Sequence, residues 1–182
     1  MDSESQTDFD RMVAELQQEI VEREKALYSD AVRREASAPK NMGRMEDADL
    51  HGVVHGWCGD TMEIYLRLDN GSTDSGAVAP GSTDGGVTSP GSSTSPTIKE
   101  ATFVTDGCGA TLACGSMLTQ IVTGMKLEKA EWVLPEDLIK ALGGLPEEHE
   151  HCAGLAVSTL QNALFNWRVS QTEEEKEGDG TG

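Results

Sequence analysis

The sequence has few basic residues, few aromatic residues and no long hydrophobic run. It contains 14 Lys and Arg against 32 Asp and Glu, which gives a formal net charge of −18. Nucleic acids and anionic membranes attract basic surfaces, so this charge argues against both and favours a basic protein partner. No apolar run approaches the roughly 20 residues that span a bilayer, and no basic region followed by an apolar one marks a signal peptide. We therefore expect a cytoplasmic protein.

Cysteine is also scarce, and its spacing excludes several common motifs. Four cysteines occur in 182 residues, and no two of them form a Cys-x-x-Cys pair. Wide spacing does not fit a small secreted disulfide scaffold. Without such a pair, the sequence lacks the usual zinc-finger and thioredoxin signatures. The length predicts one domain, and an aromatic content of 4% fits a modest core with additional polar segments.

The hydrophobic periodicity predicts an α+β domain. The N-terminal region, residues 1–28, has apolar side chains at helical spacing and is expected to form an amphipathic helix over 8–27. Three strand-like runs follow and predict an antiparallel meander. The remaining helical patterns predict a C-terminal group of helices packed on one face of the sheet. The expected strands are 50–56, 61–68 and 97–104, and the expected later helices are 109–124, 135–142 and 149–168.

Three stretches are expected to lack regular structure. Residues 29–49 are polar and contain helix breakers. Residues 70–97 consist largely of a Gly/Ser/Thr/Pro decapeptide repeat, which has too few apolar side chains to offset the entropy of ordering. We interpret the repeat as a flexible loop that interrupts a main domain of residues 29–169. The acidic residues 170–182 are expected to form a disordered tail.

Three cysteines stand in settings that suit metal ligation. Cys58 lies two residues before Asp60 and a strand, Cys108 lies between two glycines before a helix, and Cys152 follows His151 at a helix start. Thiolate is a soft ligand for iron, zinc and iron–sulfur clusters, and a helix N-terminus lowers a thiol pKa. Each cysteine alone is compatible with a small buried hydrophobe. Together, the five residues indicate an open, mixed-ligand metal or cluster site.

The other cysteine and the other histidines have plainer interpretations. Cys114 shares a helical stripe with Leu118, so we expect a core thiol rather than an extra ligand or a sulfur acceptor. Asp60 is also compatible with a turn residue, and His151 with a surface residue at a helix start. Three histidines lack comparable neighbours and are expected at the surface: His51, His55 and His149.

These motifs resemble a known family. Cys58-Gly59-Asp60, Thr105-Asp106-Gly107-Cys108-Gly109-Ala110 and His151-Cys152 are similar, in order and spacing, to motifs of the IscU/NifU N-terminal family of iron–sulfur cluster assembly scaffolds. Residues 41–49 also resemble that family, and the likeness covers about residues 27–168 apart from the repeat. The resemblance implies a compact α+β scaffold domain. It also implies a protein without turnover chemistry of its own.

The resemblance further implies a cargo, partners and ligands. The cargo is a transient [2Fe–2S] cluster, built from iron and from sulfur supplied by a cysteine desulfurase, and then passed to apo iron–sulfur client proteins. Cys58, Cys108 and Cys152 are implied as cluster ligands, with Asp60 and His151 as the nearby non-thiolate ligands. A carboxylate or imidazole binds iron less tightly than a thiolate, which leaves a position for exchange.

Two alternatives stay open at this point. The first is a zinc-containing sulfur acceptor that takes persulfide from a desulfurase, and the second is a structural zinc module. Zinc is accordingly an alternative to iron in the resting form. The family often carries a Leu-Pro-Pro-Val-Lys motif that docks a dedicated chaperone, where this chain has Leu145-Pro146-Glu147-Glu148-His149. The resemblance therefore does not extend to that chaperone as a partner.

Overall fold

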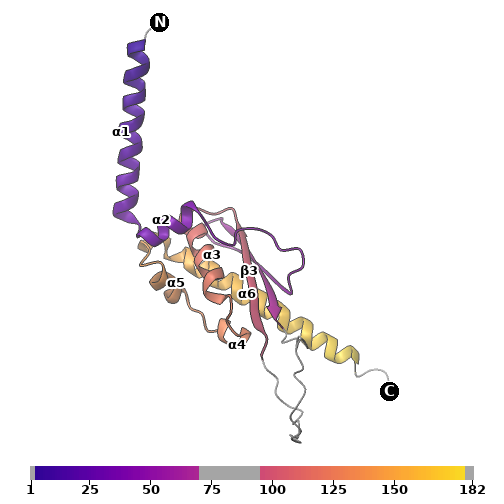
Figure 1. The fold of residues 1–182 in the computed structure, drawn as a ribbon. Helices are drawn as coiled ribbons and strands as arrows, with labels where there is room; N and C mark the ends of the chain where they lie inside the picture. The colour runs from indigo at the N-terminus through magenta and orange to yellow at the C-terminus, as the bar shows by residue number, and fades with distance from the viewer. Residues whose placement is uncertain (1–2, 70–94, 179–182) are drawn as a thin grey trace, which may run out of the picture.

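The structure, a computed structural model, describes residues 3–69 and 95–178 (Figure 1). It confirms the predicted α+β class, with one three-stranded sheet and a group of helices. Most of the predicted repeat loop, residues 70–94, lies outside the described residues. The elements are α1 Ser3–Leu27, α2 Asp30–Ser37, β1 Leu50–His55, β2 Thr61–Asp69, β3 Thr97–Thr105, α3 Gly109–Val122, α4 Leu127–Ala130, α5 Pro135–Ala141, the 3-10 turn η1 Glu147–His149 and α6 Glu150–Gly178.

The sheet is the predicted antiparallel meander in the order β1-β2-β3. Alternation along β2 buries Met62, Ile64 and Leu66 on one side, as the period of two along a strand requires. Ile64 pairs with Gly52 of β1 and with Phe103 of β3, so these three residues define one row across the sheet. This row belongs to the buried face.

Helices α3 and α6 cover that buried face (Figure 1). Helix α6 runs so close to β1 that a Cβ atom on Gly52 would lie 2.5 Å from the backbone nitrogen of Ala163. Residue 52 must therefore be glycine for the two backbones to approach this closely. The phenyl ring of Phe103 in β3 packs directly on Gly115 of α3, where a Cβ atom would lie 2.4 Å from the ring. The core lies between the sheet and these two helices, and it places their N-termini at one end of the sheet.

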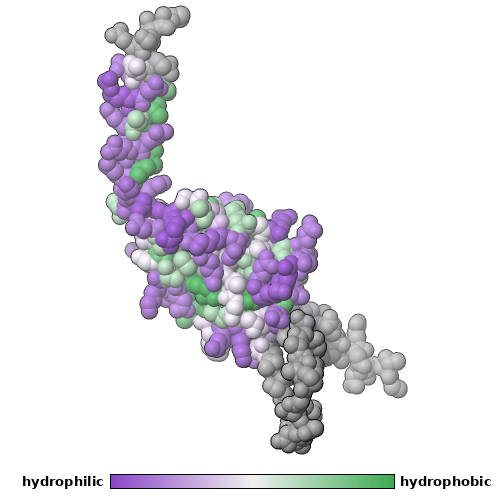
Figure 2. Space-filling model, in the orientation of Figure 1, coloured by the Kyte–Doolittle hydropathy of each residue, from purple (hydrophilic) through white to green (hydrophobic). Residues whose placement is uncertain are grey.

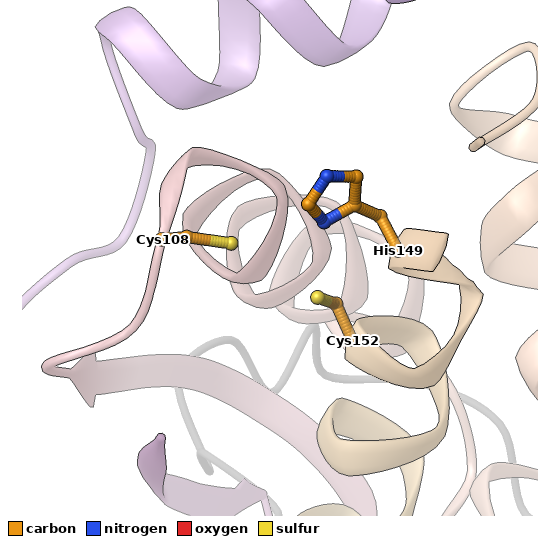
Figure 3. A group of neighbouring side chains, drawn as sticks. All are labelled: Cys108, His149 and Cys152. Carbon is orange, nitrogen blue, oxygen red and sulfur yellow. The ribbon is translucent and has the colours of Figure 1, made fainter. Parts of the chain in front are cut away.

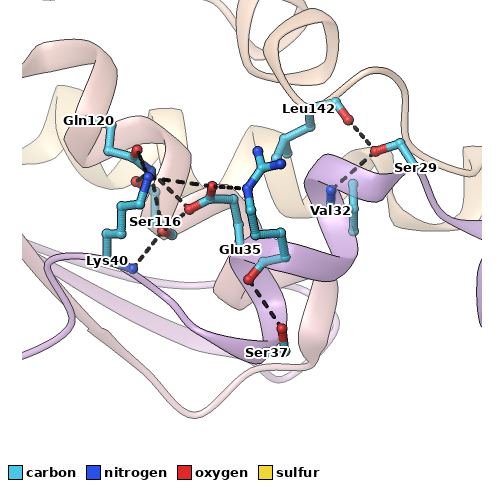
Figure 4. Close-up of polar contacts among 9 residues, drawn as sticks. Ser29, Val32, Glu35, Ser37, Lys40, Ser116, Gln120 and Leu142 are labelled. Carbon is cyan, nitrogen blue, oxygen red and sulfur yellow. Dashed lines mark hydrogen bonds and ion pairs between the residues drawn. The ribbon is translucent and has the colours of Figure 1, made fainter.

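Helix α2 falls in a region that we expected to be irregular, and that expectation was wrong. The hydroxyl of Ser29 accepts a hydrogen bond from the backbone N–H of Val32 at 3.1 Å and donates one to the carbonyl of Leu142 (Figure 4). This N-cap satisfies a donor that would otherwise be unpaired and fixes the helix start beside α5. The capping serine and the packing of Val32 against the core outweigh the polar composition of the segment.

A buried carboxylate joins α2 to α3. The side chain of Glu35 is only 1% exposed. It accepts hydrogen bonds from the hydroxyl of Ser116 at 2.8 Å and from Nε2 of Gln120 at 3.0 Å, and Nζ of Lys40 lies 3.9 Å away (Figure 4). Burial alone would raise the pKa of this carboxyl. The hydrogen bonds from Ser116, Gln120 and Arg34 outweigh burial and hold the pKa below its usual value.

The two terminal helices extend beyond the core. Helix α1 projects away from the rest of the molecule, and its apolar stripe, which includes Phe9, Leu16 and Ile20, is roughly half exposed (Figures 1 and 2). Helix α6 continues to Gly178, whereas we expected a disordered tail from residue 170. The acidic composition of the tail did not end the helix, because no Pro or Gly interrupts it before Gly178. Within the described ranges, no helix is both long and apolar enough to cross a membrane.

Candidate metal and cluster site

The candidate site lies where the starts of α3 and α6 meet the turn between β1 and β2. Cys108 is the N-cap residue of α3 and is exposed, whereas Cys152 lies in the first turn of α6 and is fully buried. Both thiols therefore sit at helix N-termini, where unpaired N–H groups and the helix dipole favour negative charge. The two residues are 44 positions apart in sequence and are brought together by the packing of α3 against α6 (Figure 3).

The β1–β2 turn brings Asp60 to the same place. The backbone N–H of Gly56 donates to the carbonyl of Asp60 at 2.8 Å, and Gly59 takes a positive φ of 95°, a conformation that glycine adopts without strain. A Cβ atom on Gly107 would lie only 2.5 Å from Oδ2 of Asp60. Glycine at position 107 therefore makes room for the Asp60 carboxylate beside the start of α3.

The hydroxyl of Thr111 connects the carboxylate to both thiols. It donates a hydrogen bond to Oδ2 of Asp60 at 2.7 Å. The same oxygen lies 3.4 Å from Sγ of Cys152 and 3.5 Å from Sγ of Cys108. Because a hydroxyl has a single hydrogen, it donates to only one of these three groups at a time, and while it donates to the carboxylate its oxygen can accept from a protonated thiol. Asp60, Cys108 and Cys152 thus surround one buried hydroxyl group.

The two thiols of this cluster differ in acidity. Burial opposes the ionisation of Cys108, but hydrogen bonds from the Thr111 hydroxyl and from the N–H groups of Thr111 and Ala110 outweigh it and lower its pKa. Burial dominates at Cys152 and raises its pKa to about 11, and the negative charges of Cys108 and Asp60 add to this effect. Without a cation, Cys108 is therefore the thiol that ionises first.

A third metal-binding side chain lies beside these two thiols. Ligand atoms of Cys108, His149 and Cys152 all lie within 4.8 Å of one another, in the part of the chain that the structure describes (Figure 3). We expected His149 at the surface, but the structure places it half-buried, because η1 turns its ring against Tyr28, with 5.6 Å between the ring centroids. The sequence offered one signal, since positions 149 and 152 are three residues apart and share one helical face.

His151 and Cys58 lie outside that group of three. Nε2 of His151 is 3.7 Å from Sγ of Cys152, and its ring contacts Trp57, with 4.9 Å between the centroids. Cys58 is exposed in the β1–β2 turn. Both residues line an open cavity of about 310 Å³ together with Trp57 and Leu155. The structure therefore places four of the five predicted site residues in contact through Thr111 and Cys152, and Cys58 lines the same cavity as His151.

The remaining cysteine and histidines follow the sequence expectation. Cys114 is fully buried among core side chains, and burial raises the pKa of its thiol. His51 and His55 are exposed on β1. Sequence reasoning missed Thr111 altogether. Its spacing of three residues from Cys108 at a helix start was the available signal.

The fold and the site together define a small α+β domain with thiol, carboxylate and imidazole groups gathered at two helix starts. A family model described as the NifU-like N-terminal domain matches residues 91–174. The iron–sulfur cluster assembly scaffold protein IscU 1 of Archaeoglobus fulgidus is 31% identical over 142 residues, which cover 78% of this chain and 76% of that protein. The nitrogen fixation protein NifU of Azotobacter chroococcum is 32% identical over 152 residues, which cover 82% of this chain and 42% of that protein.

A similar solved structure is the N-terminal part of a NifU-like protein from Brucella abortus. It has a TM-score of 0.49 and 14% sequence identity, and the match covers 77% of this chain and 93% of that one. On the sequence relatives, the chain belongs to the IscU/NifU N-terminal family. The resemblance seen in its cysteine motifs is thereby confirmed.

Proposed function

We propose that this protein is a scaffold on which a transient [2Fe–2S] cluster is assembled from iron and desulfurase-derived sulfur, and from which it passes to apo-proteins. The observation that carries the proposal is the convergence of Cys108, Cys152 and Asp60 on the Thr111 hydroxyl. Thiolates hold such clusters, and the carboxylate adds a weaker oxygen ligand. The names of relatives such as the Archaeoglobus IscU 1 support the same role.

In this proposal the ligands divide into firm and labile ones. Cys58, Cys108 and Cys152 supply thiolates, and the exposure of Cys58 and Cys108 leaves the cargo open to a partner. Asp60 or His151 completes the set at the position that exchanges most readily. Asp60 suits this task because its carboxylate has another partner when it leaves the metal. It can then accept the hydrogen bond from the Thr111 hydroxyl.

The assembly step must balance in electrons as well as atoms. Each sulfur taken from a desulfurase persulfide must gain two electrons to become sulfide. Oxidation of two Fe²⁺ to Fe³⁺ supplies two of the four electrons, and a ferredoxin-type electron carrier must supply the others. The protein contributes thiolate ligands and an open site to this chemistry. The protons of the cysteine thiols are released as the ligands bind.

The proposed partners are a cysteine desulfurase and apo iron–sulfur client proteins. The net charge of −18 favours basic surfaces on both. The side of the site that holds Cys58 also exposes Trp57, which is 86% exposed and provides an apolar anchor for a docking protein. At the position where the family resemblance implies a chaperone-docking motif, Glu147 and Glu148 form an acidic turn, η1, and we propose no chaperone there.

A zinc-containing sulfur acceptor is the second candidate. The observation that favours it is the group of Cys108, His149 and Cys152, whose two sulfurs and one nitrogen suit zinc. In that role an exposed thiol such as Cys58 would accept the outer sulfur of a desulfurase persulfide, and the proton balance would be met by its own S–H. No net oxidation would occur in such an exchange.

Anaerobic reconstitution separates the two functions. The purified protein is incubated with Fe²⁺, cysteine, a desulfurase and a reductant, and is followed by absorption and Mössbauer spectroscopy. The scaffold function predicts a cluster with two irons and two sulfides per site that moves to an apo-ferredoxin. Tightly held zinc, a persulfide on a cysteine and no cluster would overturn the scaffold function in favour of the sulfur acceptor.

A further inference from the structure

His149 has one ring nitrogen that is buried and has no partner. Nδ1 is shielded from solvent and makes no hydrogen bond within the described structure. The other nitrogen, Nε2, lies 3.8 Å from a carboxylate oxygen of Glu148. Buried polar atoms in proteins are nearly always satisfied, so an orphaned one requires an explanation. An absent ligand of suitable chemistry is such an explanation.

The surroundings of that nitrogen indicate what kind of ligand it suits. Figure 3 shows a ring nitrogen of His149 on the side that faces the sulfurs of Cys108 and Cys152. Since Nε2 faces Glu148, the nitrogen left for the thiols is Nδ1. A carboxylate near Nε2 favours the tautomer with the proton on that nitrogen, which leaves the Nδ1 lone pair free for a metal.

The charge and the distances fit a single divalent ion. Two thiolates and one neutral imidazole balance two positive charges. The three ligand atoms lie within 4.8 Å of one another. With zinc–sulfur bonds of about 2.3 Å, two sulfurs on a tetrahedral ion lie roughly 3.8 Å apart, so a contraction of at most about 1 Å closes the site. Cys108 lies at a helix cap and His149 lies in a short turn. Both can shift by that distance more easily than a residue inside a long helix.

We infer that Cys108, His149 and Cys152 bind one divalent transition-metal ion, zinc or ferrous iron, through two sulfurs and Nδ1 of His149. The inference rests on the proposed scaffold function in one respect, because this ion is the mononuclear state of the site before a cluster forms. His149 and His151 then have separate tasks. His149 serves the single ion, and His151, beside Trp57 and Cys58, lies toward the part of the site that only a cluster uses.

The test uses Co²⁺ as a spectroscopic probe, in the reduced full-length protein without sulfide. His149→Gln removes the proposed ligand, and His51→Gln is the matched control, because His51 lies exposed on β1 against Tyr65. We expect His149→Gln to weaken Co²⁺ binding at least 10–100-fold, roughly the loss caused even by changing an outer-shell partner of a metal ligand. The control should bind Co²⁺ as the wild type does. Equal affinity and equal visible bands in His149→Gln would overturn the inference.

A second measurement needs no variant. Zinc is added to ¹⁵N-labelled wild-type protein, and the ring nitrogens of His149 are followed by NMR. The inference predicts that Nδ1 of His149 shifts on binding while His51 does not. An unmoved Nδ1 in zinc-saturated protein would exclude it as the ligand. Cluster reconstitution is scored separately. If clusters form but His149 is not a ligand, only this inference fails, and if His149 binds zinc but no cluster forms, only the scaffold function fails.

Discussion

The Thr111 hydroxyl donates a 2.7 Å hydrogen bond to the Asp60 carboxylate from the first turn of α3. The donor is fully buried, so this bond forms in an environment of low dielectric and is correspondingly strong. It links the β1–β2 turn to the helix that begins at Cys108. The position of the carboxylate therefore depends on a side chain that is itself not a metal ligand.

Replacing Thr111 tests this link. Thr111→Val keeps the shape of the side chain and removes the hydroxyl, so the Asp60 carboxylate and the Cys108 sulfur lose the one donor that they share. We expect the pKa of Cys108 to rise, because the Thr111 hydrogen bond is a cause of its lowering. Alkylation of Cys108 at neutral pH, followed by peptide mass spectrometry, should become slower. Thr111→Ser keeps the hydroxyl and should retain the wild-type rate; equally slow alkylation in both variants would point to a packing effect instead.

Removing the Asp60 carboxylate should make the proposed cluster longer-lived. Asp60→Ala removes an oxygen ligand that binds iron less tightly than a thiolate, and with it the group proposed to open the site. Transfer to an apo-ferredoxin, measured by circular dichroism in the visible range, should be slower than in the wild type. Asp60→Asn removes the negative charge but can still accept the Thr111 hydrogen bond. It therefore distinguishes the effect of the charge from the effect of the side chain's position. Unchanged or faster transfer in Asp60→Ala contradicts the labile-ligand role.

The three proposed thiolate ligands should each be necessary for the cluster. Cys58→Ala and Cys108→Ala change exposed side chains, so we expect thermal stability to stay within about 0.5 kcal/mol of wild type. Cys152→Ala changes a buried side chain and should cost roughly 1 kcal/mol. All three variants should lose stable cluster assembly in anaerobic reconstitution. A normal iron and sulfide content in any one of them would remove that residue from the ligand set.

Glu35 should make stability depend on pH in the acid range. Its pKa is lowered in the folded protein, so the carboxylate stabilises the fold above its unfolded pKa of about 4.3. That contribution is lost as pH falls through the lower folded value. Glu35→Gln should cost about 1–3 kcal/mol at pH 7, and its stability should fall less steeply below pH 5 in urea unfolding. The control Glu19→Gln, in an exposed pair with Arg23, should follow the wild-type curve.

The strands and the later helices could be predicted because their burial follows a simple period. Met62, Ile64 and Leu66 alternate along β2, and the sheet face follows from that pattern. Helix α2 was missed because Glu35, a charged residue, takes one of its buried positions, and its partner Ser116 lies 81 residues away. The site likewise contains some residues that the sequence predicts and others that it does not. Motifs singled out Cys108 and Cys152, whereas Thr111 and His149 come to lie beside them only through the packing of α3, η1 and α6.

Cys114 provides the contrast to the three site cysteines. Its thiol is fully buried in the core on α3, and burial raises its pKa, so it stays protonated and apolar in character. Cys114→Ser places a hydroxyl in the buried core, and an unpaired hydroxyl there costs roughly 1–3 kcal/mol. A bond to the helix carbonyl one turn earlier would offset part of that cost.

Cys114→Ala introduces no polar group and should be milder than Cys114→Ser in thermal unfolding. Both variants should keep the wild-type cluster yield and absorption spectrum, because the thiol is fully buried in the core and is absent from the group of Cys108, His149 and Cys152. The contrary result is equally definite. Normal melting with a lost or altered cluster spectrum in Cys114→Ser would mean that the start of α3 rearranges during assembly and turns Cys114 toward the metal as a fourth thiolate.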